Sequence, residues 1–330
     1  MKAAVLYGAN KIEIRDVPTP AIAQAGEVIA DVQFVGLCKT DQQITATAPN
    51  QLPKGQELIL GHEVVCQIPD EQTYFALNNE ISCGECSYCQ EGLTSHCQNL
   101  QELGVNCNGG YAQKMLAPRS SLYPFVFSNP SLGILIEPLS CAVRGVERIL
   151  ATANLWSVDQ PTTLIIGGGL SGSLVGYLLT HSPQFQGNIK LYDIVNQPIL
   201  WAEKLGIERI TEVVKDKAHL VIECSGSPNG LDTALTSVRK AGLVCIYGVP
   251  KVGIPLPISP HELFMREIAV ITSFAGATEQ TMGKAIDYIR NDEAFFEQLL
   301  GRVISLQNLP QELTAWNPQL GTRTFVDMNA

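Results

Sequence analysis

Hydrophobic and polar residues follow two different patterns along the chain of 330 residues, and the pattern changes near the middle of the chain. In the first part they alternate over residues 11–15 and 27–32, which predicts half-exposed β-strands. Residues 139–150 then place apolar side chains at helical spacing, which predicts a helix. From residue 161 onward, apolar runs alternate with helical patterns. Because parallel strands need crossovers of about a dozen residues, this order predicts a parallel sheet joined by helices.

The expected fold class is therefore α/β, with a β-rich domain and a doubly wound parallel sheet. Buried strands are expected at residues 162–166, 189–192, 220–223, 242–247 and 268–271. The intervening and following helices are expected at residues 170–180, 198–205, 230–239 and 279–290. Residues 302–328 return to a strand-like pattern, so we expect the end of the chain to rejoin the first domain. The predicted domains are residues 1–153 together with 289–330, and residues 154–288.

Composition and charge exclude several classes of protein. Hydrophobic residues make up 45% of the chain and charged ones 16%, which is too apolar for a disordered chain. With 22 Lys and Arg against 32 Asp and Glu, the net charge is −10, and no basic cluster is present, so a nucleic-acid partner is not expected. There is no apolar stretch of about 18 residues and no signal-peptide pattern. We therefore expect a cytoplasmic protein that does not enter a membrane.

Ten cysteines need an explanation, and without an export signal a disulfide framework is not expected. Cys83, Cys86, Cys89 and Cys97 follow a C-x2-C-x2-C-x7-C pattern. Four thiolates at this spacing favour a closed tetrahedral zinc site with a structural role. An iron–sulfur cluster is the nearest alternative, but its bacterial motif places the fourth cysteine after three residues and follows it with proline.

The run Gly167-Gly168-Gly169-Leu170-Ser171-Gly172 fits the G-x-G-x-x-G pattern between a predicted strand and a predicted helix. Glycines let backbone amides approach a pyrophosphate at the helix N-terminus. Asp193 ends the next predicted strand, where a carboxylate accepts hydrogen bonds from ribose hydroxyls and repels a 2′-phosphate. The pattern predicts a dinucleotide site that prefers NAD to NADP. A tight turn without a ligand is the alternative.

A third group of residues, Cys38, His62 and Glu137, is scattered along the chain. Singly, a cysteine is usually a small buried residue and a histidine a hydrogen-bonded core residue. Together, a thiolate, an imidazole and a carboxylate can bind zinc and leave one position open to water or substrate. Asp41 could then hold the imidazole from behind. The hypothesis is a second, catalytic zinc.

In this order along the chain, the motifs resemble the medium-chain, zinc-dependent alcohol dehydrogenase family. The resemblance covers essentially the whole chain and rests on residues 36–41, 61–63, 83–97, 109–112, 137–140 and 167–172. Glu-Pro-Leu-Ser at 137–140 is similar to the sorbitol, polyol and threonine dehydrogenase branch. The resemblance implies a GroES-like catalytic domain with a structural-zinc lobe at residues 81–107, and a Rossmann NAD-binding domain.

The family implies a role for each matching residue. Cys38 and His62 would bind the catalytic zinc, and Glu63, Glu137 or both in turn would complete its ligands, with Cys141 a rival in principle. Thr40 would relay the substrate proton. The implied dinucleotide contacts are Lys39, Gly167, Gly169, Leu170, Ser171, Gly172, Asp193, Ser225, Val249 and Phe274. The same resemblance implies two zinc ions per chain and a cleft between the domains. It also implies a homo-oligomer, either a dimer or a tetramer.

The predicted function is oxidation of a secondary alcohol, polyol-, sugar- or cyclitol-like, to a ketone with NAD. Gln43 departs from the family pattern, because many members have a histidine there that releases the proton, and glutamine does not titrate. The connection from His62 to Cys83 is also short. Two alternatives stay open: a carbonyl reductase that runs in the reverse direction, and a zinc- and NAD-binding sensor or scaffold without turnover.

Overall fold

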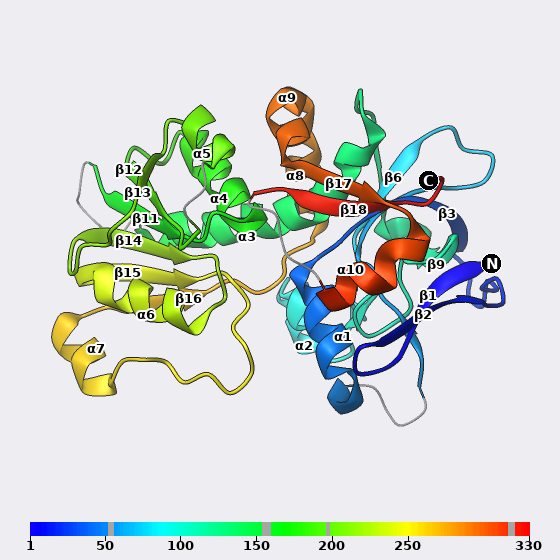
Figure 1. Cartoon of the computed structure of the whole chain (residues 1–330), viewed down its shortest axis with the longest axis horizontal. Helices are drawn as coiled ribbons and strands as arrows, with labels where there is room; N and C mark the ends of the chain where they lie inside the picture. Colours follow the sequence, from blue (N-terminus) through cyan, green and yellow to red (C-terminus); the bar gives the residue numbers. More distant parts are fainter. Residues whose placement is uncertain (52–55, 154–159, 196–198, 316–320) are drawn as a thin grey trace. The chain divides into compact units, whose positions relative to one another are not determined.

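The computed structural model describes residues 1–51, 56–153, 160–195, 199–315 and 321–330. The chain forms two compact units (Figure 1). The first, called here the β-rich unit, comprises Met1–Ser140, Ala277–Gln319 and Arg323–Ala330. The second, the parallel-sheet unit, comprises Cys141–Gly276 and Leu320–Thr322. The domain limits at residues 153 and 288, which we expected from the sequence, differ from the limits of these units and remain predictions.

The β-rich unit is built on a mixed sheet in the order β10-β6-β5-β3-β18-β17, with β9 also paired to β3. The predicted alternation over residues 27–32 lies in β3, which buries Ala30, Val32 and Val35. A smaller sheet has the order β2-β1-β4, and one hydrophobic core joins side chains of both sheets. The strands are β1 (Lys2–Gly8), β2 (Lys11–Asp16), β3 (Glu27–Gly36), β4 (Leu58–Ile59), β5 (Glu63–Gln67), β6 (Tyr74–Leu77), β7 (Glu80–Ile81), β8 (Gln101–Glu102), β9 (Lys114–Pro118), β10 (Leu122–Phe125), β17 (Leu300–Ile304) and β18 (Arg323–Asp327).

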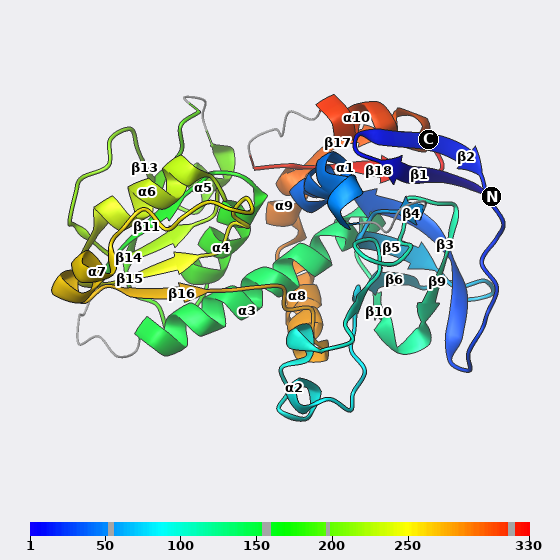
Figure 2. The ribbon, with the colours of Figure 1, turned by 90° about the horizontal axis from the view of Figure 1, so that it is seen from below.

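Helices of the β-rich unit pack around these sheets, and α1 lies beside α10 (Figures 1 and 2). The predicted helix at residues 139–150 is part of α3, which begins earlier, with Glu137 and Pro138 in its first turn. Proline is tolerated there because the first amides of a helix have no intrahelical partner. The helices are α1 (Lys39–Gln51), α2 (Ser87–Gln90), α3 (Ile136–Ala153), which continues into the parallel-sheet unit, α8 (Glu279–Asn291), α9 (Glu293–Phe296) and α10 (Leu309–Ala315).

In the parallel-sheet unit the strands follow the order β13-β12-β11-β14-β15-β16, and every pairing is parallel. This is the order of a dinucleotide-binding fold, in which ligands lie at the point where the strand order reverses, here between β11 and β14. The doubly wound α/β prediction is confirmed. The elements are β11 (Thr162–Ile166), α4 (Leu170–Thr180), β12 (Asn188–Tyr192), α5 (Leu200–Lys204), β13 (Glu208–Ile210), β14 (Ala218–Glu223), α6 (Pro228–Ser237), β15 (Val238–Ile246), α7 (Pro260–Arg266) and β16 (Ala269–Thr272).

Two local predictions were wrong, and one strand of the parallel sheet was missed. The helix expected to reach residue 239 ends at Ser237, because the β-branched, buried Val238 pairs with Ala218 and starts β15. Strand β13 was not predicted, since it has only three residues and two of them, Glu208 and Arg209, are charged, which leaves no apolar run. The terminal segment does return to the first unit through β17 and β18, but α10 lies between them. Residue 198, where a helix was expected to begin, lies outside the described residues.

None of the helices in the described part of the chain combines the length and the apolar character needed to span a bilayer.

Candidate functional site

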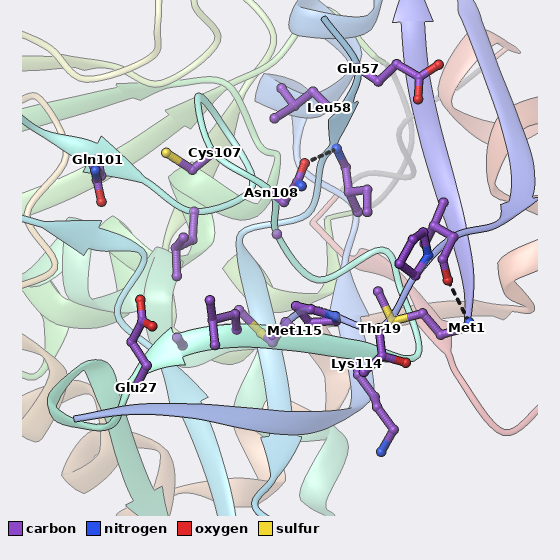
Figure 3. Close-up of a pocket in the computed structure, with 18 of the residues that line it drawn as sticks. Met1, Thr19, Glu27, Glu57, Leu58, Gln101, Cys107, Asn108, Lys114 and Met115 are labelled. Atoms are coloured by element: carbon purple, nitrogen blue, oxygen red, sulfur yellow. Dashed lines mark hydrogen bonds between the residues drawn. The ribbon is translucent and has the colours of Figure 1, made fainter. Parts of the chain in front are cut away.

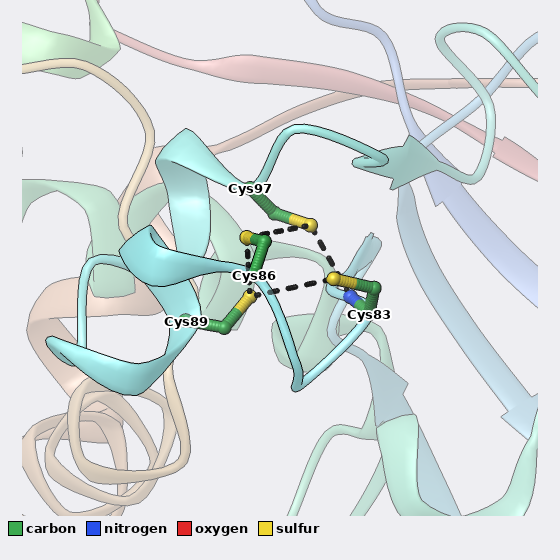
Figure 4. A group of neighbouring side chains, drawn as sticks. All are labelled: Cys83, Cys86, Cys89 and Cys97. Atoms are coloured by element: carbon green, nitrogen blue, oxygen red, sulfur yellow. Dashed lines mark hydrogen bonds between the residues drawn. The ribbon is translucent and has the colours of Figure 1, made fainter.

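The four cysteines of the predicted structural site converge on one point (Figure 4). Cys86 Sγ lies 3.5 Å from Cys89 Sγ and 4.0 Å from Cys97 Sγ, and Cys83 Sγ lies 4.0 Å from Cys89 Sγ. Four sulfurs bound to a tetrahedral zinc at about 2.3 Å would stand about 3.8 Å apart. The donor set and its spacing therefore fit a zinc ion with no open position.

Backbone amides support these sulfurs. Cys83 and Asn99 donate their N–H groups to Cys97 Sγ at 3.2 and 3.3 Å. The amide of Cys83 and that of Asn99 lower the pKa of the Cys97 thiol, against the effect of burial. Hydrogen bonds of this kind stabilise a thiolate, which is the form that binds metal.

Cys38, His62 and Glu63 form the second group, and their ligand atoms all lie within 4.8 Å of one another. Strand register brings them together, because β3 and β5 are antiparallel and pair Gly36 with Glu63. Glycine at position 36 leaves room for the Glu63 carboxylate, since a Cβ there would lie 2.1 Å from Glu63 Oε2 and would displace it. His62 and Glu63 are buried, with 5% and 1% of their surface exposed.

Asp41 stands behind this group, in the first turn of α1. Its Oδ1 lies 3.2 Å from His62 Nδ1, and its Oδ2 accepts the N–H of Cys38 at 2.9 Å. The Tyr111 hydroxyl donates to the same Oδ2 at 2.9 Å, and burial together with Asp41 raises the pKa of Tyr111 well above its usual range. A protonated Tyr111 and a carboxylate at Nδ1 leave His62 Nε2 as the ligand atom.

Arg323 is the functional residue that sequence reasoning missed. Its Nη2 lies 2.8 Å from Glu63 Oε1, and its Nη1 donates to the Leu37 carbonyl at 2.7 Å. The available signal was a lone charged residue in the otherwise uncharged start of a buried strand, Arg323-Thr324-Phe325-Val326. An arginine at this place keeps the Glu63 carboxylate oriented in a water-poor environment.

The electrostatics of the group fit a divalent cation. Burial raises the pKa of the Cys38 thiol, but His62 and Arg323 lower it, and the result is about 7. Burial raises the pKa of Glu63 to about 8, in spite of Arg323. Within the described residues, Glu63 Oε2 is buried without a hydrogen-bond partner. A thiolate, an imidazole and a carboxylate are donors that zinc takes, and a cation would favour both charged forms.

The other residues predicted for this site stand close by in the chain. Thr40 and the exposed Lys39 open α1 next to Cys38, and Gln43 is one turn further along. Glu137 is partly buried in the first turn of α3 and is not a member of the three-residue group. Burial lowers the pKa of the Arg323 guanidinium, but nearby negatively charged groups raise it above its usual value. The carboxylate of Glu137 is one of these groups.

The glycine turn, residues 167–172, has the backbone form that a dinucleotide requires. Gly167 has φ +102°, and a Cβ on Gly172 would lie 2.0 Å from the Gly167 carbonyl, so neither position accepts a side chain. Gly169 is the N-cap of α4, and nothing lies within 4 Å of the place where its Cβ would be. Leu170 and Ser171 form the first turn of α4. This open cradle at a helix N-terminus fits a pyrophosphate.

Asp193 follows β12 and faces this turn. Its Oδ2 accepts the N–H of Gly168 at 2.6 Å, and its Oδ1 accepts the N–H of Val195 at 2.8 Å. The carboxylate is therefore held at the open edge of the turn, the side on which a ribose hydroxyl would compete for it.

The strand ends beside the turn are organised by Glu223, the last residue of β14. Its buried carboxylate accepts the N–H groups of Ser225 and Gly226. A Cβ on Gly167 would lie 3.0 Å from the Ser225 amide, and one on Gly226 would lie 2.4 Å from the Val249 carbonyl. Ser225 thus borders the turn, and Val249 lies against Gly226 in the loop after β14. Phe274 follows β16, is 52% exposed, and accepts a hydrogen bond from Arg144 through its carbonyl.

A cavity of about 480 Å³ in the β-rich unit is a different place (Figure 3). Its walls are mostly apolar and include none of the three candidate ligands Cys38, His62 and Glu63. Of its charged side chains, Glu57 pairs with Arg15, Lys114 pairs with Asp31, and Glu27 accepts the N–H groups of Ala23 and Gln24. The cavity therefore plays no part in the chemistry of the metal group.

Comparison with known proteins identifies the family of the chain. Residues 24–126 match the alcohol dehydrogenase GroES-like domain, and residues 196–291 match the zinc-binding dehydrogenase domain. Over 93% of both chains, the sequence is 29% identical to the 2-dehydro-3-deoxy-L-galactonate 5-dehydrogenase of Pseudoalteromonas atlantica. It is 23% identical to D-arabinitol dehydrogenase 1 of Uromyces fabae, over 87% of this chain and 86% of that one.

Solved structures show the same fold. The glucose dehydrogenase of Haloferax mediterranei, in complex with NADP, zinc and gluconolactone, superposes with a TM-score of 0.83 over 100% of both chains at 19% identity. The GroES-like and Rossmann prediction is confirmed. Two family models, a relative that aligns over most of the chain, and a shared fold all agree with the motifs. The chain therefore belongs to the zinc-dependent medium-chain alcohol dehydrogenase family.

Proposed function

We propose that this protein transfers hydride between NAD and a secondary alcohol of the polyol, sugar or cyclitol class, and that the product is a ketone. The observation that carries the proposal is the group of the partly buried Cys38 and the buried His62 and Glu63, backed by Asp41. Relatives named as D-arabinitol, D-altritol and deoxygalactonate dehydrogenases support a polyhydroxylated substrate.

The residues of the chain divide the work. When bound, zinc supplies Lewis acidity to the substrate oxygen and the nicotinamide supplies the hydride acceptor. Cys38, His62 and Glu63 would hold the metal, and Asp41 keeps the imidazole in one tautomer. Arg323 balances the buried charge of Glu63. Glu137, in the first turn of α3, would be the alternative carboxylate ligand that the family implies.

Thr40 would take the proton of the substrate hydroxyl, since it is partly buried and adjacent in the chain to the Cys38–Lys39 pair. Gln43, one turn along α1, cannot titrate. Proton release would therefore pass through water or a ribose hydroxyl of the dinucleotide. This step distinguishes the chain from family members with a histidine at that place.

Asp193 supports NAD as the preferred dinucleotide. Its carboxylate lies at the edge of the glycine turn, where it would accept hydrogen bonds from ribose hydroxyls and repel a 2′-phosphate. Ser171 and the amides of α4 would face the pyrophosphate, and Ser225, Val249 and Phe274 would border the nicotinamide half.

We also propose a homo-oligomer, formed by two copies of this chain along β16. This strand is the edge of the parallel sheet (Figure 2), so one row of its backbone groups is unpaired within the sheet. The nearby Phe264, Met265 and Val252 are 78%, 62% and 102% exposed. An exposed apolar surface beside an open strand edge is typical of a protein interface.

A reducing compartment such as the cytoplasm suits this chemistry. All ten cysteines lie in the described part of the chain, and none of them forms a disulfide there. The proposed metal sites need thiolates, which an oxidising compartment would convert to disulfides.

The test combines metal analysis with an activity screen. Zinc-loaded protein should contain two zinc ions per chain. It should also reduce NAD with at least one member of a panel of polyols, sugars and cyclitols, and the absorbance of NADH measures this reaction. The C38S variant should keep one zinc and lose turnover. One zinc in the unmodified protein, with no turnover across the panel, would instead favour the non-catalytic sensor.

A further inference from the structure

The side chain of Trp201 contacts the backbone of the glycine turn. It lies in α5, only 3% of its surface is exposed, and its Nε1–H donates to the Gly168 carbonyl at 3.0 Å. On the other side its ring packs against α4, where a Cβ on Gly176 would lie 2.9 Å from Trp201 Cζ3. The indole is therefore held by a hydrogen bond to the turn and by contact with the helix that the turn begins.

The same indole touches the segment near the end of the chain. Gly321 has φ +76°, and a Cβ there would lie 2.6 Å from Trp201 Cδ1 and 3.5 Å from the Gly168 carbonyl. Only glycine lets the backbone pass so close to the ring in this conformation. The glycine turn, α5 and this segment thus meet at one buried side chain.

Two residues further along the chain stands Arg323, at most about 7 Å away along the backbone. Its guanidinium pairs with Glu63 and donates to the Leu37 carbonyl next to Cys38. One short segment is therefore fixed at one end by Trp201 and at the other end by a proposed ligand of the catalytic zinc.

We propose that Trp201 is a positioning residue that links dinucleotide binding at the glycine turn to the metal-ligand group through Gly321 and Arg323. The proposal rests on the proposed function. An NADH that orders the turn would fix the Gly168 carbonyl and, through the indole, the start of β18. Arg323 would then hold Glu63 more firmly, so NADH should slow the loss of the catalytic zinc.

The first experiment measures NADH binding by titration calorimetry. Trp201→Phe keeps the ring but removes the N–H, so we expect about fivefold weaker binding, the effect of one lost hydrogen bond. The matched control is Leu200→Ala, because Leu200 precedes Trp201 in the same helix and is 68% exposed. The control should bind NADH as the unmodified protein does. A side chain that only fills the core would change the melting temperature without changing the NADH affinity.

The second experiment measures the rate at which zinc passes to a colorimetric chelator, with and without saturating NADH. In the unmodified protein we expect NADH to slow the release of one of the two zinc ions several-fold, and to leave the other unchanged. Trp201→Phe should lose at least half of this protection. Gly321→Ala, which disturbs the same contact from the other side, should lose it as well.

Each outcome has a separate meaning. Unchanged NADH affinity in Trp201→Phe overturns the positioning role. Weaker NADH binding with full protection of the zinc overturns the link to Arg323. If the unmodified protein binds no NADH at all, the proposed function itself fails, and the proposal about Trp201 fails with it.

Discussion

At the scale of single residues, the metal group depends on side chains that do not bind metal themselves. The Asp41 carboxylate accepts hydrogen bonds from the Cys38 amide and the Tyr111 hydroxyl, and it lies next to His62 Nδ1. Its negative charge therefore orients two ligands at once. Such a residue affects both metal affinity and rate, because it fixes the tautomer and the basicity of the imidazole.

Asp41→Asn should lower zinc affinity and kcat by about 10- to 100-fold, because an amide keeps the shape but loses the charge at His62 Nδ1. Zinc content after dialysis against a weak chelator, and kcat at saturating zinc, would measure both effects. Asp16→Asn is the matched control, since the Asp16 side chain is 78% exposed and pairs with Lys2 at the surface. Equal zinc retention in the two variants would contradict the role of Asp41.

Arg323 makes a second prediction at this scale. Arg323→Met would leave Glu63 buried without its ion-pair partner, and we expect a loss of about 3–5 kcal/mol in the free energy of unfolding, measured with urea on zinc-loaded protein. Adding Glu63→Gln should recover part of this loss. Arg302→Met is the control, because the Arg302–Glu312 pair lies at the surface and such pairs contribute about 1 kcal/mol or less.

At the scale of elements, the two metal groups have different origins. The cysteine group lies within one short stretch whose turns bring the sulfurs together, whereas Cys38, His62 and Glu63 meet because β3 pairs with β5. One group should therefore stabilise its own lobe, and the other should rest on a sheet that is stable without it.

Cys89→Ser should release one zinc per chain and expose the amides of residues 83–99 to fast hydrogen exchange, because a structural zinc contributes directly to local folding. Cys38→Ser should also lose one zinc but leave exchange in that stretch as it was, while turnover disappears. The two variants serve as controls for each other. The same exchange pattern in both would contradict the division into a structural and a catalytic site.

At the scale of the whole molecule, β16 is an open edge with apolar side chains nearby. Phe264→Glu should shift the protein toward smaller species in light scattering after gel filtration, because a charge disfavours burial of this surface. Ile22→Glu, which changes a 57% exposed side chain in the other unit, should leave the mass unchanged. An unchanged mass for Phe264→Glu would place the interface elsewhere.

The arrangement of the parallel sheet was largely predictable. The apolar runs identified β11, β12, β14, β15 and β16, because strands inside a parallel sheet have few polar residues. The expectation that β16 is buried was wrong: it is the edge strand, and its residues are exposed or partly exposed. The short β13 was missed, since Glu208 and its neighbours carry no such run. The end of α6 was also misplaced, because pairing of Val238 with Ala218 outweighed the helical pattern.

The sequence by itself determined the features whose partners are near each other in the chain. The spacing of Cys83, Cys86, Cys89 and Cys97 and the glycine turn both specify local geometry, so their chemistry follows from the order of the residues alone. The tertiary structure alone decided that Arg323 meets Glu63 and that Trp201 meets Gly321. Such contacts depend on strand register and on close packing between distant segments. A one-dimensional pattern of polar and apolar residues does not contain that information.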